Sequence, residues 1–217
     1  MEQSANKWGV TEEESMTVTG EDGRKRCRWV GQGKDFYEAY HDAEWGVPVH
    51  DDRHHFEMLN LEGAQAGLSW ETILKKRDNY KKLFADFDPV KCAKLTDKQL
   101  EKILTNPGII RNRLKVYGVR KNALAFLKVQ KEFGTFDAYV WAFVGGKPID
   151  GRRKAMADVP GKTEISDALS KDLKKRGFTF VGSTIVYAYM QASGLVNDHV
   201  ADCFRYQPCK ALAQGNH

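Results

Sequence analysis

The sequence contains few cysteines and no long apolar run. The most apolar stretch, 178–190, is interrupted by small polar residues and is too short to cross a bilayer. The first 26 residues are polar and include an acidic run, so a signal peptide is not expected. These features predict a protein of a reducing compartment without a membrane segment, since its four cysteines are too few for a disulfide framework: Cys27, Cys92, Cys203 and Cys209.

Strand-like alternation, a glycine-rich phosphate loop and internal repeats are also missing. Apolar residues instead recur at helical spacing behind capping residues, which predicts an all-α fold with short connections. A long basic helix is expected after Pro107 and Gly108, and a buried helix over 183–193 that Gly194 ends. The other expected helix starts are Asp35, Asp51 or Asp52, Ser69, Thr96 with Gln99 as a capping box, and Ser166.

The length of 217 residues suits one large domain or two small ones. We expect residues 1–26 to be a disordered extension or an expression remnant, residues 27–204 to form a single domain, and residues 205–217 to be a C-terminal tail. A net charge of +5 favours an anionic partner, but many mildly basic proteins do not bind nucleic acid.

Glu62 lies in a run of small and apolar residues, 61–70, that ends at Trp70. Desolvating a carboxylate costs several kcal/mol, so a glutamate here needs a compensating partner. Tyr37, Tyr40 and Trp45 lie shortly upstream, and together with Trp70 they suggest a pocket for a flat, cationic or strongly hydrogen-bonding ring. The alternative is a structural acid satisfied by a backbone cap or a lysine, with the aromatic residues in plain core packing.

His199 and Cys203 are four residues apart, on one face of a helix expected to begin at residue 197 or 198. Imidazole and thiolate at this spacing can reach one Zn²⁺, and Cys27 and His41 offer two further ligands from the other end of the domain. A coincidental or core pair is the alternative. A rival histidine cluster lies in a polar turn that we expect to be exposed: His50, His54 and His55.

A helix, a tight turn and a second helix are expected over 104–113. Such a turn exposes backbone N–H groups to a phosphate, and Arg111 and Arg113 add positive charge near Gly108. An ordinary helical hairpin with solvated arginines is equally compatible with the pattern. The basic run at 171–176 is interpreted as a solvated helix face.

Taken together, these segments resemble the bacterial 3-methyladenine DNA glycosylase I family. The resemblance spans roughly residues 27–203, and its motifs occur in one order along the chain: 39–42 (AYHD), 44–48 (EWGVP), 61–70 (LEGAQAGLSW), 74–77 (LKKR), 108–111 (GIIR), 166–171 (SDALSK), 174–178 (KKRGF) and 194–199 (GLVNDH).

The resemblance implies a helix-hairpin-helix DNA glycosylase fold, with a structural zinc site that joins the N- and C-terminal segments. Glu62 would recognise the base and act in catalysis, and Tyr40 and Trp70 would stack on both faces of the ring. The usual catalytic aspartate of that superfamily is absent from the family, and Asp137 is expected to be a first-turn helix acid. By the same resemblance, the zinc ligands are Cys27, His41, His199 and Cys203.

The implied activity is base excision of 3-methyladenine from alkylated double-stranded DNA by base flipping, which releases free 3-methyladenine and leaves an abasic site. Leu68 is a candidate wedge for the gap left by the flipped base, with a core position as its alternative. A monomeric enzyme of the bacterial cytoplasm is expected. Two competing readings are a zinc-stabilised DNA-binding module without catalysis and a scaffold for a different modified base.

Overall fold

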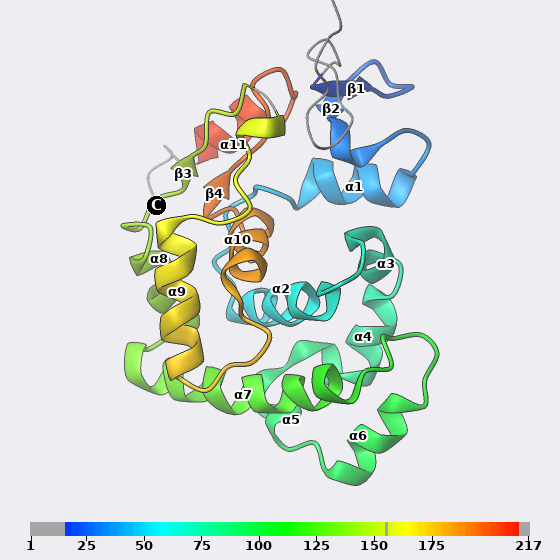
Figure 1. The fold of residues 1–217 in the computed structure, drawn as a ribbon, viewed down its shortest axis with the longest axis vertical. Coiled ribbons are helices and arrows are strands. Elements are labelled where there is room, and N and C mark those ends of the chain that lie inside the picture. Colours follow the sequence, from blue (N-terminus) through cyan, green and yellow to red (C-terminus); the bar gives the residue numbers. More distant parts are fainter. Residues whose placement is uncertain (1–15, 155, 213–217) are drawn as a thin grey trace, which may run out of the picture.

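The computed structural model describes residues 16–154 and 156–212, and within them the chain is mostly helical (Figure 1). The first 15 residues of the expected extension therefore lie outside the described part. The helices are α1 (Asp35–Ala43), α2 (Asp52–Gln65), α3 (Trp70–Leu74), α4 (Arg77–Leu83), α5 (Pro89–Ala93), α6 (Asp97–Leu104), α7 (Arg113–Phe133), α8 (Phe136–Ala142), α9 (Glu164–Lys175), α10 (Ser183–Ala192) and α11 (Tyr206–Leu212), with 3-10 turns η1 (Arg28–Val30), η2 (Ala85–Phe87) and η3 (Met156–Asp158).

Helix α2 is the centre of the fold. Every residue from His55 to Ala64 is buried, so this part of α2 has no solvated face and must be surrounded by other elements. It contacts α3, α7, α8 and α10, and Phe56 packs edge-on against Phe126 of α7 at 5.1 Å between ring centroids. A polar side chain on the last turns of this helix therefore points into protein rather than into water.

Most predicted helix starts are confirmed. Asp51, Ser69 and Thr96 each accept a hydrogen bond from the backbone N–H three residues on, and Thr96 forms the expected capping box with Gln99. Two were wrong. Asp35 is the first residue of α1, whose N-cap Lys34 makes no side-chain cap bond.

The expected start at Ser166 was also wrong, because Ser166 is the third residue of α9. Its hydroxyl accepts from the Thr163 N–H, and Thr163 is the true cap in a reciprocal capping box. A serine can serve at either end of this motif, so the sequence alone placed the start three residues late.

Two short sheets correct the all-α expectation. Strands β1 (Thr17–Thr19) and β2 (Lys25–Cys27) pair antiparallel, and β3 (Ile149–Asp150) pairs parallel with β4 (Val196–Asn197). Strands of two or three residues are too short to show alternation in a sequence. The hairpin begins before the expected boundary at residue 26, so this part of the predicted extension is folded.

The C-terminal segment also folds onto the domain rather than forming a plain tail. Helix α11 lies against β4, and the Asn197 side-chain amide donates to the Tyr206 carbonyl oxygen at 3.1 Å. The N-terminal hairpin and this C-terminal segment lie at the same end of the molecule (Figure 1). That arrangement places the first and the last described segments of the chain at one end of the fold.

The expected exposure of the histidine cluster holds for His50 but was wrong for His55, which is fully buried. His55 bonds to the Tyr189 hydroxyl at 2.7 Å and to Asp137 at 3.1 Å. Asp137 lies in the first turn of α8, as predicted. None of the described helices is long and apolar enough to span a membrane.

Candidate functional site

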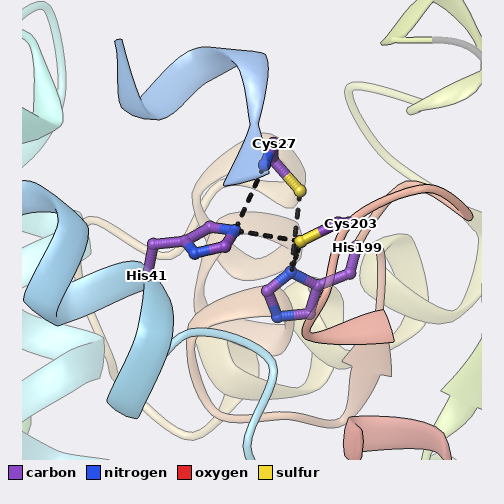
Figure 2. Close-up of side chains that lie close together, drawn as sticks. All are labelled: Cys27, His41, His199 and Cys203. Carbon is purple, nitrogen blue, oxygen red and sulfur yellow. Dashed lines mark hydrogen bonds between the residues drawn. The ribbon is translucent and has the colours of Figure 1, made fainter. Parts of the chain in front are cut away.

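Four side chains from distant parts of the sequence meet where the two chain ends come together (Figure 2). Cys27 ends β2, His41 lies on α1, and His199 and Cys203 follow β4. Their ligand atoms all lie within 4.8 Å of one another, and all four residues are buried. The group could therefore hold one metal ion, and the sequence pattern predicted its members correctly.

The expected helix under His199 and Cys203 was wrong. The chain after β4 forms a bridge at Val200 and then a turn, in which the Cys203 N–H donates to the Val200 carbonyl at 2.9 Å. A turn brings residues four apart together as a helix does, so the spacing argument succeeded on a different backbone. The Cys203 sulfur lies 3.5 Å from His199 Nδ1 and 3.4 Å from His41 Nε2.

Outer hydrogen bonds orient both imidazoles toward the cluster. His41 Nδ1 donates to Asp42 at 2.8 Å, which leaves Nε2 facing the sulfur atoms, and His199 Nε2 donates to the Trp45 carbonyl at 2.9 Å. Asp42 is held in turn by the buried Arg26 at 2.6 Å. Burial alone would raise the pKa of Asp42, but bonds from Arg26 and His41 lower it below its usual value. Such outer contacts commonly fix ligand tautomers at metal sites.

The charge state of the cluster also suits a cation. Hydrogen bonding to Cys27 lowers the pKa of the Cys203 thiol, with His199 and His41 adding to the effect, so Cys203 is held as the thiolate. The same interaction and burial raise the pKa of Cys27. The direction of the Cys203 shift favours the thiolate, which is the form of cysteine that binds a metal.

A cavity of about 270 Å³ lies beside this cluster. Aromatic rings dominate its lining, and a few polar side chains face the same space, which is the usual composition of a small-molecule site. The lining residues are Trp29, Tyr37, Tyr40, Trp45, Glu62, Gln65, Trp70, Val159, Ala188, Gln191 and Asp198.

Glu62 is the unusual member of this lining. The residue is only 4% exposed, and its carboxylate takes part in no hydrogen bond or ion pair with the residues that the structure describes. Burial raises its pKa to about 8. The structural alternative is not supported, because Lys115 instead donates to the carbonyls of Ala64 and Ala66 at the end of α2. A buried acid without a partner at a cavity indicates a ligand site.

Tyr40 and Trp70 both line the cavity, as predicted, but they are in contact with each other. Their ring centroids are 5.4 Å apart and the planes are inclined by 48°. A ring inserted between two aromatic faces needs about 7 Å, or twice a contact distance of ~3.5 Å. The expected stacking on both faces therefore does not match this arrangement. The indole Nε1 of Trp70 is buried and has no hydrogen-bond partner among the described residues.

The turn between α6 and α7 matches the predicted hairpin. An added Cβ at Gly108 would lie 2.7 Å from the Asn79 side chain, which explains the glycine. The Gly108 N–H donates to the Asn106 side chain and the Ile110 N–H to the Tyr80 hydroxyl, so two of the N–H groups expected to be open are already used.

The two arginines of this turn differ. Arg113 is ion-paired with Glu101 at 2.6 Å and lies over the Tyr117 ring. Arg111 is exposed and forms no ion pair within the described part of the chain. Leu68 is 41% exposed in the turn that joins α2 to α3, between the lining residues Gln65 and Trp70, so its core alternative was wrong.

The methyladenine glycosylase family model matches residues 29–206. The chain belongs to this family. It is 50% identical over 182 residues to DNA-3-methyladenine glycosylase 1 of Escherichia coli strain K12, which covers 84% of this chain and 97% of that protein. It is 49% identical over 185 residues to DNA-3-methyladenine glycosylase of Haemophilus influenzae, which covers 85% and 97% respectively.

Solved structures of family members share the fold. A crystal structure of 3-methyladenine DNA glycosylase I has 50% identity and a TM-score of 0.80, covering 82% of this chain and 98% of that one. A tyrosine-to-phenylalanine variant of 3-methyladenine DNA glycosylase I, solved in complex with 3-methyladenine, has 37% identity and a TM-score of 0.79 over 80% of this chain and 94% of that one. The family assignment made from the sequence motifs is therefore confirmed.

Sequence reasoning left several lining residues unassigned. Trp45 was named with the pocket aromatics and Gln65 only as part of the 61–70 motif, whereas Trp29, Val159 and Gln191 were not named as site residues. An uncharged amide on a helix looks like any solvated polar residue until the fold places it at a cavity. Asp198 was noticed only as part of the 194–199 motif.

Proposed function

We propose that this chain is a base-excision repair glycosylase that hydrolyses the N-glycosidic bond of 3-methyladenine in alkylated double-stranded DNA. The observation that carries the proposal is Glu62, a buried carboxylate that has no partner among the described residues and faces an aromatic cavity. Support also comes from relatives at about half identity that are named DNA-3-methyladenine glycosylases, and from a family member solved with 3-methyladenine. The products are free 3-methyladenine and an abasic site.

The chemistry requires little from the protein beyond binding. Methylation at N3 gives the base a positive charge, so the base is already a good leaving group and need not be protonated. Flipping the base out of the stack costs a few kcal/mol, and this cost is smallest for a damaged base that pairs weakly. Glu62 stabilises the charged base by a charge-assisted hydrogen bond, which is about twice as strong as a neutral one. The N-glycosidic bond breaks and its electron pair leaves with the base, which departs uncharged, while water bonds to the sugar carbon and releases one proton to solvent.

The cationic base also changes the protonation of Glu62. With a pKa of about 8, this carboxyl is largely protonated at neutral pH in the free protein. A nearby positive charge favours the carboxylate, so binding of the charged base draws a proton off Glu62. Normal adenine is uncharged and does not favour the carboxylate form of Glu62. Glu62 therefore distinguishes the damaged base from the undamaged one by its charge.

Tyr40 and Trp70 supply the aromatic surface for the base. A cation on an aromatic face gains about 0.5–2 kcal/mol. Because the two rings are in contact, the base lies against the tilted pair unless Trp70 moves outward on the five-residue helix α3. The unpartnered indole N–H of Trp70 is available for a hydrogen bond during that movement.

The Cys₂His₂ cluster is proposed to bind one Zn²⁺ in a structural role. Tetrahedral zinc with Zn–S about 2.3 Å and Zn–N about 2.0 Å places sulfur and nitrogen ligands about 3.5 Å apart. The three sulfur–nitrogen separations of Cys27–His199, Cys203–His199 and Cys203–His41 are 3.6, 3.5 and 3.4 Å. Four protein ligands leave no position for a reacting water, so the metal would tie the two chain ends rather than take part in hydrolysis.

The base-release assay tests the activity directly. Purified protein incubated with methylated double-stranded DNA is expected to release 3-methyladenine, detected by chromatography, and to leave alkali-labile abasic sites. A zinc-stabilised module that binds DNA without catalysis would bind the same DNA and release nothing. A scaffold for another modified base would release that base instead.

The first prediction concerns the turn between α6 and α7, which we propose as a helix-hairpin-helix contact to the phosphate backbone through Gly108, Arg111 and Arg113. Replacing Arg111 by alanine should weaken binding to all DNA sequences alike. The slope of log K against log salt should fall by about 0.9 for one lost phosphate contact. Arg113→Ala should have less effect, since Glu101 already neutralises that guanidinium.

Lys128→Ala is the matched control, because Lys128 is an exposed cation near the far end of the same helix α7. Filter binding at several salt concentrations provides the measurement. An Arg111→Ala variant with unchanged affinity and unchanged salt slope would place the phosphate contact on another surface.

The second prediction concerns Leu68 as the wedge that fills the gap left by the flipped base. Leu68→Ala should lower base release from duplex DNA about tenfold, since unstacking costs a few kcal/mol and an inserted apolar side chain offsets part of that cost. Binding of free 3-methyladenine should not change, because Leu68 is exposed and is not a lining residue of the cavity. Leu124→Ala, an exposed leucine on α7, serves as control. If Leu68→Ala weakened the binding of free 3-methyladenine as much as it lowered release from duplex DNA, Leu68 would not act as a wedge.

A further inference from the structure

A second polar group faces the cavity beside Glu62. Gln191 lies on the last turn of α10 and lines the same space. Its side-chain amide donates from Nε2 to Asp198 Oδ2 at 2.8 Å. Asp198 is 1% exposed, so this contact is sheltered from water.

The contact fixes which end of the amide faces Asp198. An ionised carboxylate only accepts hydrogen bonds, so the NH₂ group of Gln191 must point at Asp198 and the carbonyl oxygen Oε1 must point away from it. Asp198 is also fully engaged: Arg153 Nε donates to Oδ1 at 2.8 Å, and the Tyr187 hydroxyl donates to Oδ2 at 2.5 Å. Arg153 compensates the charge of Asp198, so this aspartate is not a second site for a cationic ring.

We infer that Gln191 is a specificity-determining residue of the base pocket and that Asp198 is its positioning residue. This inference rests on the proposed function. Oε1 of Gln191 and the Glu62 carboxylate are two acceptors on one cavity, and the exocyclic amino group of 3-methyladenine carries two N–H donors. In the inferred binding mode, one amino group donates to both acceptors.

The same pair rejects a base with a carbonyl at that position. In 3-methylguanine the exocyclic amino group at carbon 6 is replaced by an oxygen, which accepts and cannot donate. That oxygen would leave the Gln191 acceptor without a donor, and leaving a polar group of the site unpaired is one way in which a protein discriminates between such analogues. The pocket is thus selective for 6-amino over 6-oxo methylated purines.

The test compares the two free bases on one protein. Binding of 3-methyladenine and of 3-methylguanine is measured by quenching of the pocket tryptophans, first for the unmodified chain and then for Gln191→Met. Methionine keeps the length of glutamine but offers no strong acceptor. We expect 3-methyladenine to bind roughly 3- to 10-fold more weakly, as for one lost hydrogen bond. Binding of 3-methylguanine is expected to stay the same or improve, so the ratio of the two affinities shrinks.

Asp198→Asn provides a second variant with the same expected change in the ratio. An asparagine can donate as well as accept, so the Gln191 amide is no longer held in one orientation. Asp150→Asn is the matched control. Asp150 likewise accepts from a tyrosine hydroxyl, that of Tyr206, and pairs with Lys210, but it does not line the cavity. For Asp150→Asn, the ratio of the affinities for 3-methyladenine and 3-methylguanine should equal that of the unmodified chain.

The outcomes separate the two proposals. If the unmodified chain neither binds nor releases 3-methyladenine, the proposed function fails and the Gln191 inference fails with it. If the unmodified chain releases 3-methyladenine but Gln191→Met leaves the affinity ratio unchanged, the proposed function stands and Gln191 is only part of the wall. Equal weakening of both bases, with a lowered melting temperature, would likewise reduce Gln191 to a packing residue.

Discussion

Replacing Glu62 by glutamine is expected to lower the rate of 3-methyladenine release by roughly 10- to 150-fold while the fold survives. Glutamine keeps the size and most of the hydrogen-bonding shape of glutamate but cannot become negative. The loss corresponds to a charge-assisted bond of about 1.5–3 kcal/mol. Single-turnover release from methylated duplex DNA measures the effect, and thermal melting checks the fold.

The same substitution should change how activity and stability depend on pH. Release by the unmodified chain should increase as pH rises toward about 8, because the charged base requires the carboxylate and burial raises the pKa of Glu62 to about 8. Glu62→Gln has no such group, so its residual rate should be flat over that range.

Stability should move in the opposite direction. A carboxyl whose folded pKa is raised stabilises the fold fully below its unfolded pKa, near 4.5, and this contribution is lost as pH rises toward about 8. The unfolding free energy of the unmodified chain should fall by about 3–5 kcal/mol across that window, as an upper bound. Glu62→Gln should avoid the decline and be the more stable protein at pH 8. A variant that loses stability but keeps full release activity would make Glu62 a structural acid.

Removing one metal ligand should have the largest effect on the folded state. We expect Cys203→Ser to lose bound zinc and to melt far below the unmodified chain. The apparent binding free energy of a structural zinc is about 10 kcal/mol, which is comparable with the whole stability of a domain, about 5–15 kcal/mol. Metal analysis of freshly purified protein and a thermal melt with and without a strong chelator provide the measurement.

Cys92→Ser is the matched control for this prediction. Cys92 is a buried cysteine whose thiol donates to the Phe84 carbonyl at 3.0 Å, far from the cluster in the sequence. It should keep one zinc per chain. Unmodified protein that purifies without zinc, or Cys203→Ser with full zinc content, would show that the four residues do not form a zinc site.

The sequence predicted the helices that have strong capping residues, the hairpin at Gly108 and the members of the Cys/His group. Those features depend on local chemistry or on motifs with fixed order. The sequence did not predict the short strands, because they have too few residues to show alternation. It also misplaced the start of α9, because Ser166 suits either position of a capping box.

The sequence predicted only those cavity residues that lie close to Glu62 along the chain. Glu62 attracted attention because an acid in an apolar run is costly, and the aromatic residues near it were visible in the sequence. Gln191 and Val159 come from segments far along the chain from Glu62, and only the packing of α10 against α2 and the path of the chain after β3 bring them to the site. Contact between Tyr40 and Trp70 also depends on how α3 is placed, which no motif encodes.

The burial of the cysteines has a consequence for a protein that repairs alkylated DNA. Any cell that accumulates methylated bases also contains the electrophile that made them, and thiolates are among the best nucleophiles that such a reagent meets. All four cysteines of this chain are buried, and Cys27 and Cys203 are 1% and 3% exposed. Because alkylation requires an accessible thiolate, the protein presents no ready target of this kind. It can therefore keep working in the conditions that create its substrate.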